Sequence, residues 1–309
     1  QRSVAMTEHV AVLMGGWSAE REVSLVSGKA VAEALRSGGK RVTEVDVGPN
    51  VAEILAGIRP DVAFNALHGR FGEDGCMQGI LEALAIPYTH SGVLASALAM
   101  NKPAAKRLFR ESGIVCPDGV VANREHVIDG SVMELPFVVK PLNEGSSVGV
   151  SIHLDGAEEK PFANGEWPYG EMVLVERYVP GREITVAVLG ERSLGVTEIR
   201  PRSGFYSYDA KYVEGEAAHD CPAQLPPEDY EAAKATAQAA HDALGCCGVS
   251  RADFRYDDTG PGQARLYLLE VNTQPGMTPL SLVPEIAAHA GIGFKDLVLW
   301  MLEDAGCER

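Results

Sequence analysis

Basic charge is scarce in this chain of 309 residues. Lys and Arg number 27 against 43 Asp and Glu, which gives a formal net charge of −16. Proteins that bind nucleic acid do so through basic patches, so nucleic acid is excluded as a predicted partner. The excess of acidic residues does not exclude a small phosphate ligand, because such a ligand needs only a few local cations.

Long apolar runs and targeting signals are also missing. The sequence has no stretch of about 18 apolar residues, so it predicts no membrane-spanning helix and no membrane partner. The N-terminus lacks the basic, apolar and small-residue succession that forms a signal peptide. We expect residues 1–5, which precede Met6, to be an expression remnant, and they are left out of the fold prediction.

Cysteine is present but is not arranged for a disulfide framework or a metal site. The six cysteines form no CxxC pair and show no metal-type spacing with histidine. Reduced thiols in a cytoplasmic enzyme are the simplest interpretation. With 46% hydrophobic and 23% charged residues the composition is typical of a globular protein, and the length predicts roughly two domains.

The first hundred residues predict an α/β arrangement. In "HVAVLMGGWSAEREVSLVSGKAVAEALRSGG", an apolar strand at 10–14 is turned by Gly15-Gly16, and apolar residues then recur at helical spacing. "DVAFNALHG" repeats the apolar strand with polar residues and glycine at its end. Alternating strands and helices predict a parallel sheet, whose ligands gather at the carboxyl ends of its strands. Residues 15–20 and 65–72 lie at those ends.

The segment from residue 101 mixes helices and strands. We predict a helix in "MNKPAAKRLFRESGI" and strands in "FVVK", in "VLVER" and over 184–189 and 193–199. The stretch 201–224 is long, polar and rich in Gly and Tyr, and loops of that length inside a compact domain are usually functional. An alanine-rich helix opens at Pro226-Pro227 and ends at Gly245.

A β-hairpin is predicted near the end of the chain. "SRADFRY" and "ARLYLLEVN" flank "DDTGPGQ", which reads as a turn. With the turn centred between Pro261 and Gly262, Asp253 lies directly opposite Glu270, with side chains about 5 Å apart. Glu270 and Asn272 share a face because strand side chains alternate. A two-residue slip would still leave all three on one face.

Two carboxylates and an amide on one face indicate a divalent cation. Close unpaired carboxylates repel each other and resist burial, and a cation between them relieves both effects. Hard oxygen ligands favour Mg²⁺, which completes its shell with water and phosphate oxygens, and Glu270 is placed to bridge two ions. The alternative is a solvated sheet end, the ordinary interpretation of an isolated E-x-N.

Several positions are candidates for binding a nucleotide. Lys140 closes "FVVK" and precedes "EGSSVGV", a run of small residues whose N–H groups can approach a polyphosphate. This is not a Walker A sequence, and a plain hairpin turn is the alternative. Lys102 is a further candidate, with a solvated lysine as its alternative. Glu176 and Glu183 bound a connector that can expose its backbone to an adenine edge. Glu176 would accept from the amino group and Glu183 from ribose, although each alone is typical of a surface residue.

Seven segments resemble the ATP-grasp superfamily and, within it, the D-alanine–D-alanine ligase family. They are "GGWSAEREVSL", "LHGRFGEDG", "KPLNEGSSVGV", "VLVERYVPGREITVAVL", "DAKY", "SRADF" and "LLEVNTQPGMTPLSLVP". They span nearly the whole chain in the family's order, which is far more specific than any one motif. The family often has threonine where Trp17 stands and lysine where Arg177 stands. Trp17 adjoins the substrate loop, so the resemblance is less close on the substrate side.

The resemblance implies a fold class that is α/β, with α+β in the C-terminal half. The fold is ATP-grasp, preceded by a Rossmann-like pre-grasp domain with a parallel sheet. Three lobes are implied, at residues 1–100, 101–181 and 182–309, with ATP held between the second and the third. The loop 201–224 becomes a lid that excludes water from a reactive acyl phosphate.

The resemblance also implies the ligands and the residues that bind them. ATP is the co-substrate, and two Mg²⁺ ions, replaceable by Mn²⁺, are held by Asp253, Glu270 and Asn272. The residues implied to contact ATP are Lys102, Lys140, Ser146, Ser147, Glu176, Arg177, Val179, Glu183 and Lys211. Those implied to bind D-alanine are Glu20, His68, Lys211, Arg251, Ser281 and Leu282. The catalytic set is Glu20, Ser146, Tyr212, Arg251 and Gly276.

The resemblance implies a role in the family's reaction for each of these residues. Glu20 holds the ammonium of the first D-alanine, with His68 nearby, while Lys102 and Lys140 contact the phosphates. Arg251 and the backbone N–H of Gly276 stabilise a tetrahedral oxyanion. The second D-alanine's carboxylate is received by Ser281, Leu282 and Lys211. The lid is locked over the site by Ser146 and Tyr212.

The implied activity is the ATP-dependent joining of two D-alanines through an acyl phosphate, with release of ADP and phosphate. The product, D-alanyl-D-alanine, serves peptidoglycan precursor synthesis in the cytoplasm, and a homodimer is expected. Tyr212 favours the dipeptide, and a D-alanine–D-lactate ligase is the alternative. A non-catalytic nucleotide-binding protein of the same fold is a second alternative. A Rossmann dehydrogenase is disfavoured because the G-x-G-x-x-G spacing is missing.

Overall fold

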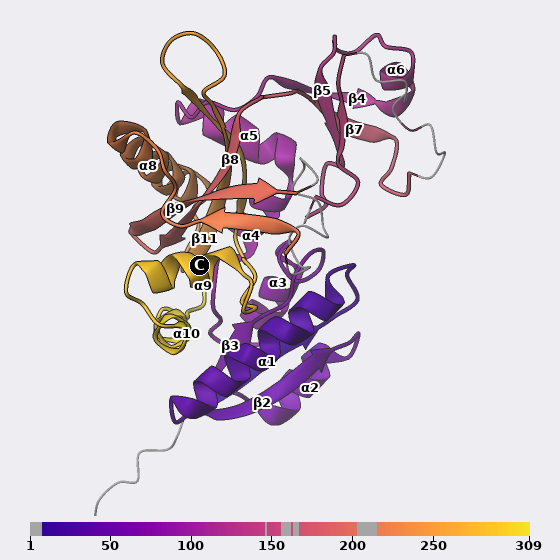
Figure 1. Ribbon diagram of the computed structural model, residues 1–309. Helices are drawn as coiled ribbons and strands as arrows, with labels where there is room; N and C mark the ends of the chain where they lie inside the picture. Colours follow the sequence, from indigo (N-terminus) through magenta and orange to yellow (C-terminus); the bar gives the residue numbers. More distant parts are fainter. Residues whose placement is uncertain (1–7, 146, 156–161, 163–166, 203–214) are drawn as a thin grey trace, which may run out of the picture.

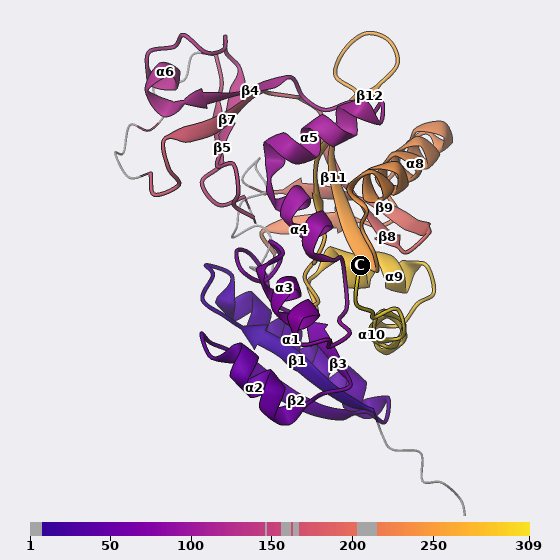
Figure 2. The same ribbon diagram turned by 180° about the vertical axis from the view of Figure 1, so that it is seen from behind.

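Three β-sheets form the framework of the molecule. The computed structural model describes residues 8–145, 147–155, 162, 167–202 and 215–309. Figures 1 and 2 show the N-terminal sheet at one end, the sheet of β4, β5 and β7 at the other, and the sheet of β8, β9 and β11 between them. Any site that draws on residues from all three must therefore lie near the middle sheet.

The N-terminal sheet is parallel, as predicted, with strand order β2-β1-β3. β1 is buried along its whole length because alternate side chains pack on α1 and on α2 with α3. The bounds are β1 His9–Gly15, α1 Arg21–Ser37, β2 Arg41–Val47, α2 Val51–Ile58, β3 Val62–Asn65 and α3 Cys76–Ala83. Residues 16–20 and 66–75 follow β1 and β3 at the carboxyl edge of the sheet.

The second sheet is antiparallel, with strand order β4-β7-β5-β6. Its strands alternate: Phe137 and Val139 join a small core with α6, while Lys140 and Glu176 belong to the opposite face. The bounds are β4 Gly119–Asn123, α6 Arg124–Ile128, β5 Phe137–Lys140, β6 Ser151–His153 and β7 Met172–Arg177. The residues 141–150 connect β5 to β6, so "EGSSVGV" lies in a hairpin connection.

The third sheet has strand order β10-β9-β8-β11-β12, with antiparallel pairing throughout. Ile184, Val186 and Val188 of β8 pack on the alanine face of α8, a helix that begins and ends where the sequence predicted. The opposite face carries polar side chains near one end. The bounds are β8 Arg182–Leu189, β9 Arg192–Pro201, β10 Ala217–Asp220, α8 Pro227–Leu244, β11 Val249–Asp257 and β12 Arg265–Asn272.

The predicted pairing of Asp253 with Glu270 is confirmed, and Arg251 pairs with Asn272. The predicted centre of the turn is wrong: the pairs nearer the turn, from Phe254 with Leu268 to Asp257 with Arg265, are centred on Pro261. A bulge after Asp253 makes up the difference, so Asp253, Glu270 and Asn272 share one face as predicted, with Arg251 beside them.

Four more helices lie in the described part of the chain: α4 Val93–Met100, α5 Lys102–Glu111, α9 Leu282–His289 and α10 Phe294–Glu303. α9 and α10 share one core with α1 and the end of β8, so the two ends of the chain pack together. α5 packs through Ala105 and Phe109 into the core under α8. Asn101 caps α5 by accepting from the N–H of Ala104, so Lys102 stands in the first turn.

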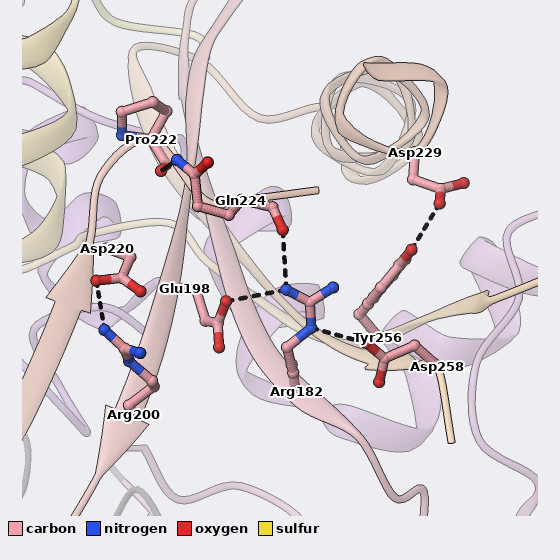
Figure 3. A network of polar contacts seen from close by, with 9 residues as sticks. All are labelled: Arg182, Glu198, Arg200, Asp220, Pro222, Gln224, Asp229, Tyr256 and Asp258. Atoms are coloured by element: carbon pink, nitrogen blue, oxygen red, sulfur yellow. Dashed lines mark hydrogen bonds and ion pairs between the residues drawn. The ribbon is translucent and has the colours of Figure 1, made fainter. Parts of the chain in front are cut away.

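The prediction that 201–224 is all loop is wrong at its C-terminal end. Ala217–Asp220 forms β10 and pairs with residues 198–201 of β9; residues 203–214 lie outside the described part of the chain. Polar contacts fix this end (Figure 3): Arg200 pairs with Asp220 at 2.5 Å, and Arg182 bonds Glu198 at 3.1 Å and the Gln224 carbonyl at 3.0 Å. The segment thus returns to the sheet on an anchored strand.

Candidate functional site

Two adjoining pockets lie beside the middle sheet. The first, here called the arginine pocket, spans about 770 Å³ of space, part of it open to solvent, between the loops after β1 and β3, the end of β12 and the start of α9. It gathers every described residue predicted to bind D-alanine, and with them Gly276 of the predicted catalytic set; the former are Glu20, His68, Arg251, Ser281 and Leu282. The remaining one, Lys211, lies outside the described residues.

The second pocket, here called the lysine pocket, spans about 920 Å³ of space, part of it open to solvent, between the second and third sheets. It gathers every described residue predicted to contact ATP: Lys102, Lys140, Ser147, Glu176, Arg177, Val179 and Glu183. Ser146 and Tyr212, like Lys211, fall outside the described residues, so their predicted roles stay predictions. Lys102, Glu144 and Glu270 line both pockets, which therefore meet at these three side chains.

The hairpin face carries charges that are compensated within the chain. Arg251 donates to both oxygens of Asp253, at 2.8 Å and 2.7 Å, and the hydroxyl of Thr185 donates to the same carboxylate at 2.6 Å. Lys102 Nζ lies 3.3 Å from Glu270 Oε2. The amide oxygen of Asn272 accepts from the Gln274 N–H at 2.8 Å. The predicted oxyanion-binding arginine is thus held against a predicted metal ligand.

The donor set on this face fits Mg²⁺ in its chemistry. Asp253, Glu270 and Asn272 offer only oxygen atoms, and Mg²⁺ takes few protein ligands beside water and phosphate. The two cations already drawn to these carboxylates, Arg251 and Lys102, show that the face favours positive charge. Among the described residues no cluster of three or more His, Cys, Asp or Glu is arranged for a metal, so the metal site stays a prediction that depends on the asparagine.

The loops after β1 and β3 bring a second group of acids to the arginine pocket. Glu20 precedes α1 and is almost fully buried, and Gly69 leaves room for its carboxylate, since a Cβ there would lie 2.6 Å from Glu20 Oε2. Glu73 accepts from the Gly69 N–H at 3.1 Å. Burial, and then the neighbouring Glu20, raise the pKa of Glu73 to about 8, so this carboxyl group is protonated at neutral pH.

His68 forms part of the pocket wall as a neutral imidazole. Its Nδ1 faces the Gln274 carbonyl at 3.2 Å and must donate there, so Nε2 accepts from the Ser27 hydroxyl at 3.1 Å. Burial lowers the pKa of His68, which agrees with this tautomer. Ser27 also accepts from the Met277 N–H at 3.2 Å. The histidine therefore ties the loop after β3 to the loop after β12.

The far side of the arginine pocket is built by the start of α9. Ser281 precedes the helix, and its hydroxyl accepts from the Thr278 N–H at 2.9 Å. A Cβ at Gly276 would lie 2.7 Å from Ser281 Oγ, so the glycine lets these two segments approach. Gly276 and Ser281, which were predicted for different steps, are thereby close neighbours in the pocket.

In the lysine pocket a buried carboxylate lies between two ammonium groups. Glu176 Oε2 is 2.7 Å from Lys140 Nζ, and Glu176 Oε1 is 2.5 Å from Lys106 Nζ. Burial disfavours the charged forms of Lys140 and Glu176, but their mutual attraction is stronger, so the pKa of Lys140 is raised and the pKa of Glu176 is lowered. The predicted adenine acceptor is therefore ionised and already ion-paired on both oxygens.

The connector between β7 and β8 is held by an arginine that sequence reasoning missed. Arg255 donates to the carbonyls of Val179 and Gly181, at 3.1 Å and 2.6 Å, and its Nη1 lies 3.6 Å from Glu183 Oε2. Glu73, Glu144 and Lys106 were also missed. The segment "GEDG" was quoted for its resemblance without a role for its glutamate, and Lys106 was available as a lysine one helical turn after Lys102.

Comparisons with known proteins agree over both halves of the chain. The family model described as "D-ala D-ala ligase C-terminus" matches residues 116–303, and the one described as "D-ala D-ala ligase N-terminus" matches residues 48–91. The chain is 57% identical over 308 residues to a D-alanine–D-alanine ligase of Parvibaculum lavamentivorans, covering 99% of this chain and 100% of the relative. A D-alanine–D-alanine ligase of Methylorubrum extorquens is 59% identical, covering 98% and 100%.

Solved structures give the same result for the fold. A D-alanine–D-alanine ligase from Bacillus anthracis complexed with ATP matches with a TM-score of 0.81 and 32% identity, over 96% of each chain. A VanG D-Ala:D-Ser ligase from Enterococcus faecalis matches with a TM-score of 0.78 and 27% identity, over 96% of this chain and 99% of the other. Within the described part of the chain, no helix has the length and apolar character needed to cross a membrane.

Proposed function

The chain belongs to the D-alanine–D-alanine ligase family, and from this premise we propose that the lysine pocket holds ATP while the arginine pocket holds both D-alanines. The enzyme joins two D-alanines to D-alanyl-D-alanine at the expense of ATP, a step of peptidoglycan precursor synthesis. Its fold is the ATP-grasp fold with a parallel N-terminal sheet.

The observation that carries the proposal is the boundary between the two pockets. Only Lys102, Glu144 and Glu270 among the described residues line both. A phosphoryl group moving from ATP to a D-alanine carboxylate must cross such a boundary. Lys102 supplies positive charge there, since its Nζ bonds the Glu144 carbonyl at 2.6 Å and lies beside Glu270.

Within the lysine pocket the residues divide by the part of ATP that they suit. Lys140 and the Ser147 loop suit the phosphates, and the connector held by Arg255 offers backbone groups to adenine and Glu183 to ribose. Glu176 stays in the adenine-binding set as a carboxylate whose charge the lysines balance. Arg177 and Val179 contribute through the same connector.

The divalent ions of the proposal would be held by Asp253, Glu270 and Asn272. When bound, Mg²⁺ offsets the charge of the terminal phosphates during transfer, and Mn²⁺ serves in its place. In this chain Arg251 now holds Asp253, and we expect it to release the carboxylate when Asp253 becomes a ligand, because a cation there repels the guanidinium. A freed guanidinium faces the arginine pocket, where acyl transfer is expected.

Both chemical steps then follow from the side chains of the arginine pocket. Glu20 holds the ammonium of the first D-alanine, so its carboxylate can attack the γ-phosphate and become an acyl phosphate with a good leaving group. The amine of the second D-alanine attacks the acyl carbon, and the tetrahedral intermediate expels phosphate. Arg251 and the Gly276 N–H stabilise the oxyanion, while Ser281 and Leu282 receive the second carboxylate.

The predicted lid and the choice of the second substrate complete the proposal. The lid of the proposal is the stretch 201–224, in which Lys211 would receive the second carboxylate and Tyr212, together with Ser146, would lock the lid over the site. Tyr212 supports the dipeptide as product. We place the enzyme in the cytoplasm because it needs ATP, and as a homodimer by family resemblance. The separation into lobes at 1–100, 101–181 and 182–309 belongs to the same proposal.

Product analysis tests the function directly. The purified enzyme receives ATP, Mg²⁺, D-alanine and D-lactate at neutral pH, and products are separated by mass. We expect D-alanyl-D-alanine with one ADP and one phosphate per peptide bond. Predominant depsipeptide would overturn the choice of acceptor, and phosphate release without any ligated product would overturn the activity. Sedimentation of the enzyme as a monomer would overturn the homodimer.

A further inference from the structure

Lys106 is a deeply buried ammonium group without a part in the mechanism above. It lies on the inner side of α5, and its side chain is 3% exposed. Its neighbours on that side of the helix, Ala105 and Phe109, are core residues. An ammonium in such a place is costly unless it is paired, so the partner of Lys106 indicates why a lysine stands there.

That partner is Glu176, and the same carboxylate also binds Lys140. The three groups form a row in which Glu176, 1% exposed, separates two ammonium groups at 2.5 Å and 2.7 Å. Only Lys140 lines the lysine pocket as a cation of this row; Lys106 does not. One lysine therefore faces the proposed phosphates, and the other faces the protein interior.

The two lysines have different roles in balancing the buried charge of Glu176. If Lys140 turns from Glu176 toward a phosphate, the buried carboxylate loses a partner. A buried charge left unpaired is strongly destabilising, so with a single lysine Glu176 would retain Lys140 and oppose phosphate binding. With Lys106 in place, one ion pair remains after Lys140 has moved.

We propose that Lys106 is a positioning residue for ATP: it keeps Glu176 paired and so releases Lys140 to the phosphates. The proposal rests on the placement of ATP in the lysine pocket. It concerns the phosphate part of the ligand. Lys106 does not line the pocket, and its contact with the adenine-binding set is through Glu176, a contribution that cancels when ATP is compared with adenosine. Lys106 acts through Glu176 and Lys140, not on the nucleotide itself.

A titration series with adenosine, ADP and ATP tests the proposal on the intact chain. We define the phosphate increment as the ratio of the adenosine Kd to the ATP Kd, so that any change in adenine binding cancels. Lys106→Met removes the inner charge at similar volume. We expect the increment to fall at least about tenfold in this variant, with kcat changed much less than KM for ATP.

A second variant separates a positioning role from a merely structural one. In Lys106→Met/Glu176→Gln no carboxylate holds Lys140, so the increment should return to within about threefold of wild type. The control is Arg107→Met, which removes the same charge from the exposed side of α5 and should leave the increment unchanged. If Lys106→Met is too unstable to titrate, the double variant still decides: an increment as small as that expected for Lys106→Met overturns the proposal.

Two other outcomes would also overturn it. One is an unchanged increment in Lys106→Met, and the other is an equal loss of adenosine and ATP affinity, which is what a purely structural ion pair between α5 and β7 would give. If the proposed placement of ATP is wrong, the result is different: Lys140→Met would then have the same phosphate increment as the wild type.

Discussion

The lysine pocket and the arginine pocket arrange their buried charges differently. At the wall of the lysine pocket, the buried row of Lys106, Glu176 and Lys140 has two cations for one carboxylate. Among the described residues, the arginine pocket is lined by four acids and two permanent cations, Lys102 and Arg251; the acids are Glu20, Glu73, Glu144 and Glu270. A row with two ammonium groups suits phosphates, and a cluster of acids suits an ammonium group and divalent ions.

The protonation of the buried groups differs as well. In the lysine pocket, close ion pairs outweigh burial and raise the pKa of Lys140 and lower the pKa of Glu176, while burial lowers the pKa of Lys106. The arginine pocket removes one charge by protonation, since burial lifts the pKa of Glu73 to about 8. The comparison indicates which charged groups are available to ligands and which are neutralised within the protein. Four substitutions test this difference between the pockets.

The largest effect is expected at Glu270, because it belongs to both pockets. Glu270→Gln keeps the shape but removes a charge that pairs with Lys102 and is proposed to bind the metal. We expect kcat to fall by about three orders of magnitude or more, read as ADP formation with D-alanine. Glu303→Gln, on the exposed side of α10, is the control. A Glu270→Gln enzyme with undiminished turnover would remove this residue from the chemistry.

The next effect is expected at Arg251, which belongs only to the arginine pocket. Arg251→Lys keeps the charge but loses the two-pronged bond to Asp253 and the planar contact with an oxyanion. We expect dipeptide formation to fall about 10²- to 10³-fold, with more phosphate released per peptide bond. Quantifying both products in one reaction measures this. An effect on the ATP KM alone would place Arg251 with the nucleotide and contradict the division into pockets.

We expect the effect of Glu73 to be on the free energy of unfolding and not on turnover. Its native pKa of about 8 exceeds the ordinary value of 4.5, so between these values the folded state holds a proton that the unfolded state has lost. Stability contributed by this group is therefore present below about pH 4.5 and declines as pH rises to about 8.

Glu73→Gln removes that decline. Relative to wild type, its free energy of unfolding should gain up to about 1.4 kcal/mol per pH unit between pH 5 and 8, and level off above. Urea unfolding at several pH values measures the gain. Glu53→Gln, at an exposed position of α2, is the control. A difference that does not vary with pH would mean that Glu73 is ionised in the folded protein.

The smallest effect is expected at Arg255, on the rim of the lysine pocket. Arg255→Met removes the bonds to the Val179 and Gly181 carbonyls and loosens the connector. We expect KM for ATP to rise about three- to tenfold with kcat nearly unchanged. Arg265→Met, exposed on the same hairpin, provides the control. Loss of kcat without a change in KM would contradict a role in holding the nucleotide.

The elements that sequence predicted well are those governed by periodicity or by counting. The parallel N-terminal sheet followed from alternating strands and helices. The pairing of Asp253 with Glu270 was predicted by counting across the turn, and the bulge after Asp253 offsets the error in the predicted turn centre. Strand alternation placed Asn272 on the same face as Glu270. The resemblance assigned one set of residues to ATP and another to D-alanine, and the described members of each set line one pocket.

What the sequence could not supply were contacts between distant segments that share no pattern. In sequence Lys106 resembles an exposed helical lysine, and only the packing of α5 into the core with α8, together with the approach of Glu176 from β7, makes it a buried cation. The pKa of Glu73 depends on the approach of Glu20 from another loop. β10 is a four-residue strand inside a polar stretch, and its pairing with β9 is set by tertiary context.

A crystal structure with Mn²⁺ and a non-hydrolysable ATP analogue tests the central claim most directly. The claim is that the hairpin face binds the cations that carry the terminal phosphates, at the boundary between the two pockets. Anomalous scattering should locate manganese among the oxygens of Asp253, Glu270 and Asn272, with Arg251 released from Asp253. Nucleotide bound without manganese on this face, and with the Arg251–Asp253 pair intact, would contradict the account.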